Sequence, residues 1–183
     1  EGFRKGIEYF QQAIDKDPNY AQPYSRMADC YHLLADYNFV SPKEAIPKAK
    51  AAMMKALELD ETLADAHASL ASMKYNYDWD WAGAETEFKR AVALNPSYAT
   101  AHHWYAIYLM LMGRLDEALP EIKRAQELDP LSLIINANVG FRLHLARRYD
   151  EAIVEFRKAL EMAANFAVGH SYLGRAFLQK GMH

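Results

Sequence analysis

The stretch Ala84–Pro96, AETEFKRAVALNP, contains a short pattern that recurs along the chain. A small residue, Ala84, is followed by an aromatic residue, Phe88, then by Ala91 and finally by Pro96. The same order recurs three times, at Gly6, Phe10, Ala13 and Pro18, at Ala118, Ile122, Ala125 and Pro130, and, without the proline, at Ala152, Phe156, Ala159 and Ala164.

The spacing of two independent markers shows that this pattern is a true repeat. One marker is the small residue midway along alternate apolar segments, namely Ala28, Ala71, Ala106, Gly140 and Gly174. The other is an alanine late in the segments between them, namely Ala13, Ala56, Ala91, Ala125 and Ala159. Both series have spacings of 43, 35, 34 and 34 residues, so one unit carries an insertion of about nine residues and the next carries one extra residue. Such a period is typical of stacked helical hairpins, because a single hairpin cannot bury its apolar face alone.

These residues resemble the tetratricopeptide-repeat family, whose unit is a helix–turn–helix of 34 residues. The apolar residue followed by Gly or Ala is present in five units, for example at Leu70-Ala71 and Val139-Gly140. The Ala-x3-Phe of the family is matched by Ala84/Phe88 and Ala152/Phe156, and its late proline by Pro18, Pro96 and Pro130. The tryptophan that the family carries near the start of the first helix is replaced by Tyr24, His67, His102, Asn136 and His170.

The resemblance implies an all-α fold, a right-handed α-α superhelix of stacked helical hairpins with about ten helices. We expect one domain over residues 1–183, divided into units at about 1–20, 21–63, 64–98, 99–132, 133–166 and 167–183, with the first and last units incomplete. The expected helices are about Arg4–Lys16, Gln22–Ala35, Pro42–Leu59, Ala64–Tyr77, Trp81–Leu94, Thr100–Met112, Asp116–Leu128, Leu133–Arg147, Asp150–Met162 and Val168–Lys180.

Two expected helices begin with capping signals, and the last expected helix has apolar residues that would be exposed to solvent. Ser41 before Pro42 and Asp80 before Trp81 are predicted N-caps, so the long insertion is expected to lengthen the helix that begins at Pro42. An incomplete last unit would leave Leu173, Ala176 and Phe177 uncovered, either because the chain is part of a longer solenoid or because another copy covers them.

The composition and the absence of known motifs exclude several classes of function. The formal net charge of −3 gives no basic footprint, which argues against a nucleic-acid partner, and no apolar run is long enough for a membrane span. The single Cys30 fits a reducing, cytoplasmic setting. We find no phosphate-binding loop, nucleophile elbow or metal-ligand spacing, so the sequence predicts no enzyme, no cofactor and no metal site.

Partner binding is therefore the leading hypothesis. In the family, first helices line a concave groove that receives a protein or peptide partner. The residues expected there are Arg26, Asp29, Tyr75, His103, Trp104, Ile107, Phe141, Arg142, Tyr172 and Arg175. The aromatic loop Tyr75–Trp81 either packs internally or contributes a ligand contact. The alternative function is a self-association or regulatory module of a larger bacterial regulator or signalling protein, with a homo-oligomer formed through the exposed C-terminal helix.

Overall fold

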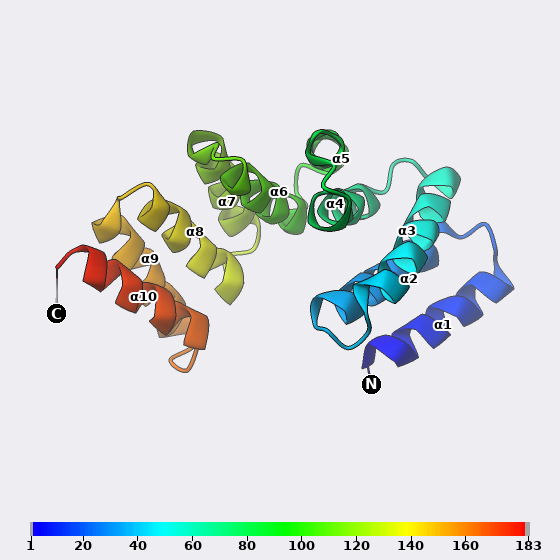
Figure 1. Cartoon of the computed structure of the whole chain (residues 1–183), viewed down its shortest axis with the longest axis horizontal. Coiled ribbons are helices and arrows are strands. Elements are labelled where there is room, and N and C mark those ends of the chain that lie inside the picture. The colour runs from blue at the N-terminus through cyan, green and yellow to red at the C-terminus, as the bar shows by residue number, and fades with distance from the viewer. Residues whose placement is uncertain (1, 182–183) are drawn as a thin grey trace. The chain divides into compact units, whose positions relative to one another are not determined.

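A computed structural model describes residues 2–181, and in that part of the chain it contains ten α-helices, one π-helical turn and no strand. Figure 1 shows the helices coloured in chain order. Their bounds are α1 Gly2–Lys16, α2 Ala21–Asp36, α3 Pro42–Leu59, α4 Ala64–Met73, η1 Lys74–Asp78, α5 Trp81–Leu94, α6 Ala99–Leu111, α7 Leu115–Leu128, α8 Leu133–Leu145, α9 Tyr149–Met162 and α10 Ala167–Gln179. The all-α class and the number of helices are confirmed.

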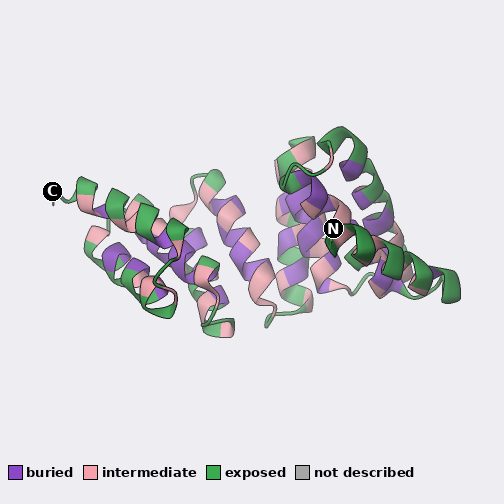
Figure 2. Cartoon of the chain, turned by 90° about the horizontal axis from the view of Figure 1, so that it is seen from below, coloured by how far each residue is buried: buried purple, intermediate pink, exposed green. Residues whose placement is uncertain are grey.

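The chain divides into two compact units, Glu1–Pro96 and Ser97–His183. In unit 1, α2 packs on α3 and α4 on α5, with α1 against α2. In unit 2, α6 packs on α7, α8 on α9, and α10 against both α8 and α9. Figure 2 shows buried residues along the helices of each unit and exposed residues on their outer sides. The assignment of all 183 residues to one domain stays a prediction.

The predicted N-caps differ in outcome. The Asp80 carboxylate accepts a hydrogen bond from the Gly83 backbone N–H at 2.9 Å, which confirms it as the cap of α5. Ser41 occupies the N-cap position of α3, but its side chain makes no capping hydrogen bond. Its backbone carbonyl instead accepts from the N–H groups of Glu44 and Ala45 at 2.9 and 3.0 Å. The predicted N-cap position of Ser41 is therefore confirmed, but without a side-chain hydrogen bond, and the insertion does lengthen this helix.

The one extra residue of the 35-residue unit lies in the π-helical turn η1. A π turn holds more residues than an α turn, so it accommodates an insertion without breaking the helix. The turn ends at Trp79, whose backbone is left-handed with φ of 58°, and the Asp80 N–H closes it on the Lys74 carbonyl at 3.2 Å. The predicted helix Ala64–Tyr77 is thus an α-helix only as far as Met73.

Residues at the position of the missing family tryptophan link four of the first helices to the turn before them. In four units the side chain hydrogen-bonds the backbone carbonyl six residues upstream, in the pairs Tyr24–Pro18, His67–Glu61, Asn136–Pro130 and His170–Ala164. The distances are 3.2, 3.0, 2.9 and 2.7 Å, respectively. A tyrosine, a histidine or an asparagine can make this bond because each carries a donor at the end of a short, stiff side chain. These histidines therefore have a structural role.

The last helix is better covered than the sequence suggests. Ala176 is fully buried, and Leu173 and Phe177 pack against the core of α8 and α9. The guanidinium of Arg157 also lies 5.8 Å from the Phe177 ring centroid. The expectation that these three residues lack cover is wrong, because the hairpin before α10 already buries its inner face. Leu178, on the same helix, is 64% exposed.

Helices α8 and α9 approach each other closely at Gly140. A Cβ atom built on Gly140 would lie 2.5 Å from Cε1 and 2.6 Å from Cδ1 of Phe156, whose side chain is fully buried. Carbon atoms cannot approach that closely, so α8 can pack on α9 here only because residue 140 lacks a side chain. At the corresponding position of α10, Gly174, no atom lies within 4 Å of such a Cβ.

We predict opposite effects for the same substitution at these two glycines. Gly140→Ala should lower the free energy of unfolding by about 1–3 kcal/mol, because the buried Phe156 ring must shift. Gly174→Ala should leave it unchanged or raise it by up to about 1 kcal/mol, because alanine favours the helix and meets no neighbour. Urea denaturation of both variants measures the difference, and equal effects would show that the packing at Gly140 is assigned incorrectly.

Candidate partner-binding site

Two of the predicted partner-binding residues form a charged cluster between α2 and α4 in unit 1. The Arg26 guanidinium lies 2.9 Å from an Asp65 carboxylate oxygen and 3.5 Å from one of Asp29. The Ser69 hydroxyl donates to Asp29 at 2.6 Å. Burial raises the pKa of the Asp29 carboxyl to about 6, although Ser69 and Arg26 act to lower it. The one cation of this cluster, Arg26, is thus already paired with acids of the same unit.

The aromatic loop of unit 1 divides into packed and exposed members. Tyr75 is buried, and its ring lies 6.0 Å from Trp81 and 6.2 Å from Phe88, measured between centroids. The Tyr77 hydroxyl donates to the Asp36 carboxylate. Trp79 is 71% exposed and meets Trp81 edge-on at 6.0 Å. Tyr75 therefore packs inside the unit, and Trp79 presents its ring outward.

In unit 2 the predicted residues of α8 and α10 form a row of rings and cations. Phe141 stacks on Tyr172 with centroids 4.8 Å apart and an interplanar angle of 18°. The Arg175 guanidinium lies 5.9 Å from the Tyr172 ring, and that of Arg142 lies 6.0 Å from Phe141. Phe141 and Tyr172 are only partly buried, and Arg175 is exposed. Flat rings flanked by guanidinium groups are typical of protein recognition surfaces.

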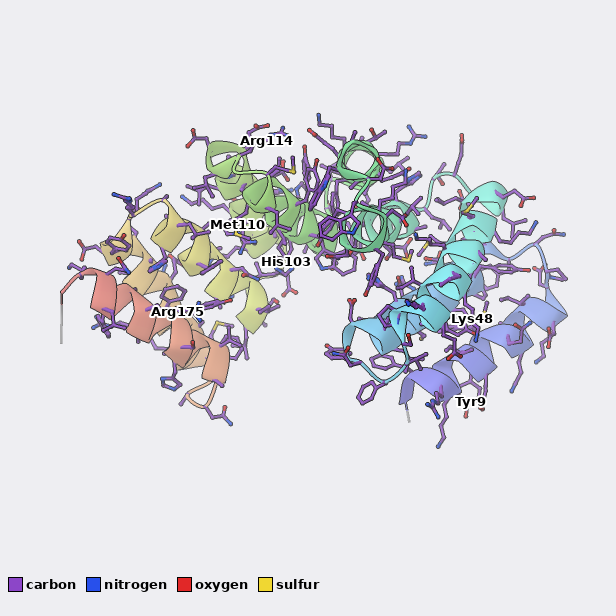
Figure 3. The ribbon with its side chains drawn as sticks, in the orientation of Figure 1. Tyr9, Lys48, His103, Met110, Arg114 and Arg175 are labelled. Carbon is purple, nitrogen blue, oxygen red and sulfur yellow. The ribbon has the colours of Figure 1, made fainter. Side chains whose placement is uncertain are left out.

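Beside this row lies a buried hydrogen-bonded chain of three residues, His103, Asn138 and Arg142. The Asn138 amide nitrogen lies 2.8 Å from Nε2 of His103, and Nη1 of Arg142 donates to the Asn138 side-chain oxygen at 2.7 Å. His103 comes from α6, and Figure 3 labels it together with Arg175 on α10. Asn138 is not among the ten predicted residues; its position one helical turn before Arg142 is the signal that could have indicated it.

The charged side chain of Arg142 is deeply buried. Arg142 is only 2% exposed, and burial lowers the pKa of its guanidinium to about 10. Burial, together with the smaller effect of the nearby Arg142 charge, also lowers the pKa of His103 to about 4. His103 is therefore neutral at pH 7, and its Nε2 accepts the hydrogen bond of the Asn138 amide.

The remaining two predicted residues, Trp104 and Ile107, lie on α6 and are partly buried. Two hollows of the described surface are lined by other residues. One of about 550 Å³ runs along α7 and is lined by Asp116, Leu119, Pro120, Lys123, Arg124 and Glu127. Another of about 460 Å³ lies between α1 and the end of α2.

Metal sites and membrane spans are the other features considered for residues 2–181. Within that range no three His, Cys, Asp or Glu side chains converge in a way that could hold a metal ion. None of its helices combines the length and the apolar character needed to cross a membrane. The structure therefore adds no metal-ligating group to the predicted residues.

Comparison with known proteins shows what a part of this chain resembles. Residues 80–132 match the family model described as tetratricopeptide repeat. The transcriptional regulator HilA of Salmonella typhimurium is 29% identical over 119 residues, which cover 65% of this chain and 21% of HilA. The chain thus corresponds to about a fifth of that relative's length.

Solved structures share the fold. The structure of YrrB, described as a TPR protein with an unusual peptide-binding site, is 24% identical and superposes with a TM-score of 0.67, over 97% of this chain and 86% of YrrB. The human IFIT1 dimer with m7Gppp-AAAA is 20% identical and gives a TM-score of 0.78, over 99% of this chain and 44% of IFIT1. At these identities the likeness concerns the fold.

Successive antiparallel hairpins with small residues at their contacts define a helical-repeat protein of the solenoid type. The tetratricopeptide-repeat family model matches residues 80–132, and helical hairpins of the same kind recur before and after them.

We predict that acid weakens unit 2 through His103. Its pKa in the folded chain, about 4, lies below the ordinary value of 6.5, so the neutral ring stabilises the fold fully above pH 6.5. This contribution, at most about 3 kcal/mol, is lost as the pH falls through 4. His103→Gln should flatten the dependence of the unfolding free energy on pH between 6.5 and 4, because glutamine does not titrate. An unchanged slope in urea titrations across that range would contradict the prediction.

Proposed function

We propose that the first-helix face of unit 2, formed by α6, α8 and α10, binds an amphipathic segment of a protein partner. The observation that carries the proposal is the row Phe141–Tyr172–Arg175, in which two stacked, partly exposed rings end in an exposed guanidinium. Rings of this kind supply a large contact area at a small entropic cost. Trp104 and Ile107, partly buried on α6, add apolar surface to the same set of helices.

Unit 1 supports partner binding less well. Its first-helix residue Arg26 already pairs with Asp65 at 2.9 Å, and the Asp29 carboxylate is held by Ser69. A partner would have to compete with these internal hydrogen bonds. Replacing an internal hydrogen bond by one to the partner contributes little net free energy to binding. We therefore assign the proposed contact to unit 2.

The test is selection from a random 12-residue peptide library displayed through its C-terminus, with the whole chain as bait. We expect enriched peptides to carry aromatic or aliphatic residues at helical spacing. Tyr172→Leu and Arg175→Ala should each weaken their binding by about tenfold, because each removes one anchor of the row. Tyr9→Leu, at an exposed tyrosine of α1, is the matched control and should bind normally. If no peptide is enriched over an unrelated bait, the proposed function is wrong.

The second candidate is a self-association module of a larger regulator, and the similarity to HilA favours it. Leu178 on α10 is 64% exposed and Val168 is 36% exposed, so an apolar edge is present on that helix. On this hypothesis the mass in sedimentation should rise with concentration, and Leu178→Lys should return it to that of one chain. A constant mass across the accessible concentrations would exclude self-association through α10.

A further inference from the structure

The Arg142 guanidinium is buried with one edge unpaired. Nη1 donates to the side-chain and backbone oxygens of Asn138, at 2.7 and 3.3 Å. Nε and Nη2 have no hydrogen-bond partner among residues 2–181, and neither atom is exposed to solvent. Buried donors are almost always paired, and an unpaired buried cation is among the costliest arrangements in a protein. A position kept at that cost points to a ligand that is absent from the free chain.

The free edge has a shape that this chain uses elsewhere for carboxylates. Nε and Nη2 of Arg114 donate to the two oxygens of Glu117 at 2.7 and 2.6 Å. The same two atoms of Arg148 donate to the two oxygens of Glu151, both at 2.6 Å. These parallel bonds form because the guanidinium edge and a carboxylate are both planar and equally spaced. In Arg142 the identical pair of donors is the pair left open.

In unit 2 the acidic residues within helices lie on other helices than the one that carries this edge. The helices α6, α8 and α10 contain no Asp or Glu at all, whereas α7 and α9 carry four each. In unit 1, by contrast, α2 and α4 include Asp29, Asp36 and Asp65. The proposed binding face of unit 2 is therefore cationic and unneutralised, which is complementary to an acidic segment.

We propose that the Nε/Nη2 edge of Arg142 binds the side-chain carboxylate of an Asp or Glu in the partner segment. This inference rests on the proposed function and specifies its ligand: an amphipathic segment in which an acidic residue adjoins the apolar residues that contact Phe141 and Tyr172. Both nitrogens are covered in the free chain. The acidic side chain of the partner therefore reaches them when a neighbouring side chain changes its rotamer.

A nucleic-acid backbone fits this face less well than a protein carboxylate does. Phosphate binding draws its affinity from several exposed Lys or Arg side chains along the strand. Within the bounds of α6, α8 and α10 the only exposed one is Arg175, since Arg142 is buried. One planar, desolvated fork is suited to a single carboxylate and gives specificity rather than electrostatic attraction at long range.

The test repeats the peptide selection with variants of Arg142. Peptides enriched on the wild-type chain should carry an Asp or Glu at one position beside the apolar residues, and changing it to Asn or Gln should weaken binding by about tenfold to a hundredfold. The peptide C-terminus is fused in the library, so only side-chain carboxylates are available. Arg142→Met should abolish the preference for an acidic residue and retain that for apolar residues. Arg142→Lys should reduce the acidic preference, because lysine lacks the fork.

Two controls separate this role from a structural one. Arg148→Met removes an exposed arginine with the same edge geometry and should leave the selected sequences unchanged. Circular dichroism and urea denaturation should show Arg142→Met to be at least as stable as the wild type, because the substitution removes an unpaired buried charge. A large loss of stability in both Arg142 variants would indicate a structural role and overturn the inference.

The remaining outcomes each decide a separate point. Enriched apolar peptides with no acidic preference, or with the same preference on Arg142→Met, would overturn the inference and leave the proposed function intact. Absence of any enrichment would overturn both. Binding of a 12-nucleotide single-stranded RNA that is lost in Arg142→Met would show that phosphate, rather than a protein carboxylate, occupies the edge.

Discussion

The close contact between Gly140 on α8 and the buried Phe156 ring on α9 is the constraint on which this hairpin and the candidate site of unit 2 depend. At Gly140 and Phe156 the approach leaves no room even for a methyl group. This contact fixes the rotation of α8 about its axis, because any other rotation would bring a side chain against the ring. Once α8 is fixed, Asn138, Phe141 and Arg142 take their positions. The site is thus a consequence of the packing beneath it, so a fault at residue 140 would disturb recognition as well as stability.

Much of the fold could be predicted because it depends on periodic sequence signals. The repeat spacing located the nine-residue insertion and the extra residue, and small-residue positions such as Ala71 and Gly140 proved to be buried. The helix that follows the insertion begins at Pro42, as predicted. The π turn was beyond prediction, because an extra residue can be taken up by a loop as easily as by a helix. The missing side-chain cap at Ser41 depends on a local rotamer, which sequence signals do not determine.

The candidate site was less predictable, because exposure and pairing depend on neighbours that are distant in sequence. The position within the repeat put Tyr75, Arg142 and Arg175 in one class, yet Tyr75 is packed, Arg142 is buried with an open edge, and Arg175 is exposed. The two units also differ in a way that the repeat conceals. In unit 1, Arg26 has its own acid at Asp65, whereas the corresponding helices of unit 2 provide none for Arg142. A repeat fold can therefore keep one architecture while the chemistry of its faces diverges.

The central claim is that the Arg142 edge is open in the free chain and closes on a carboxylate of the partner. The most direct measurement is the side-chain Nε–H resonance of Arg142 by NMR, assigned from its loss in Arg142→Met. Arg114 and Arg148, whose edges hold Glu117 and Glu151, are internal references for the carboxylate-bonded state. Our account predicts that the Arg142 resonance differs from these two in the free chain and moves towards them when a glutamate-containing peptide is added. A resonance that already coincides with them in the free chain, or one that does not move on addition of a bound peptide, would contradict the account.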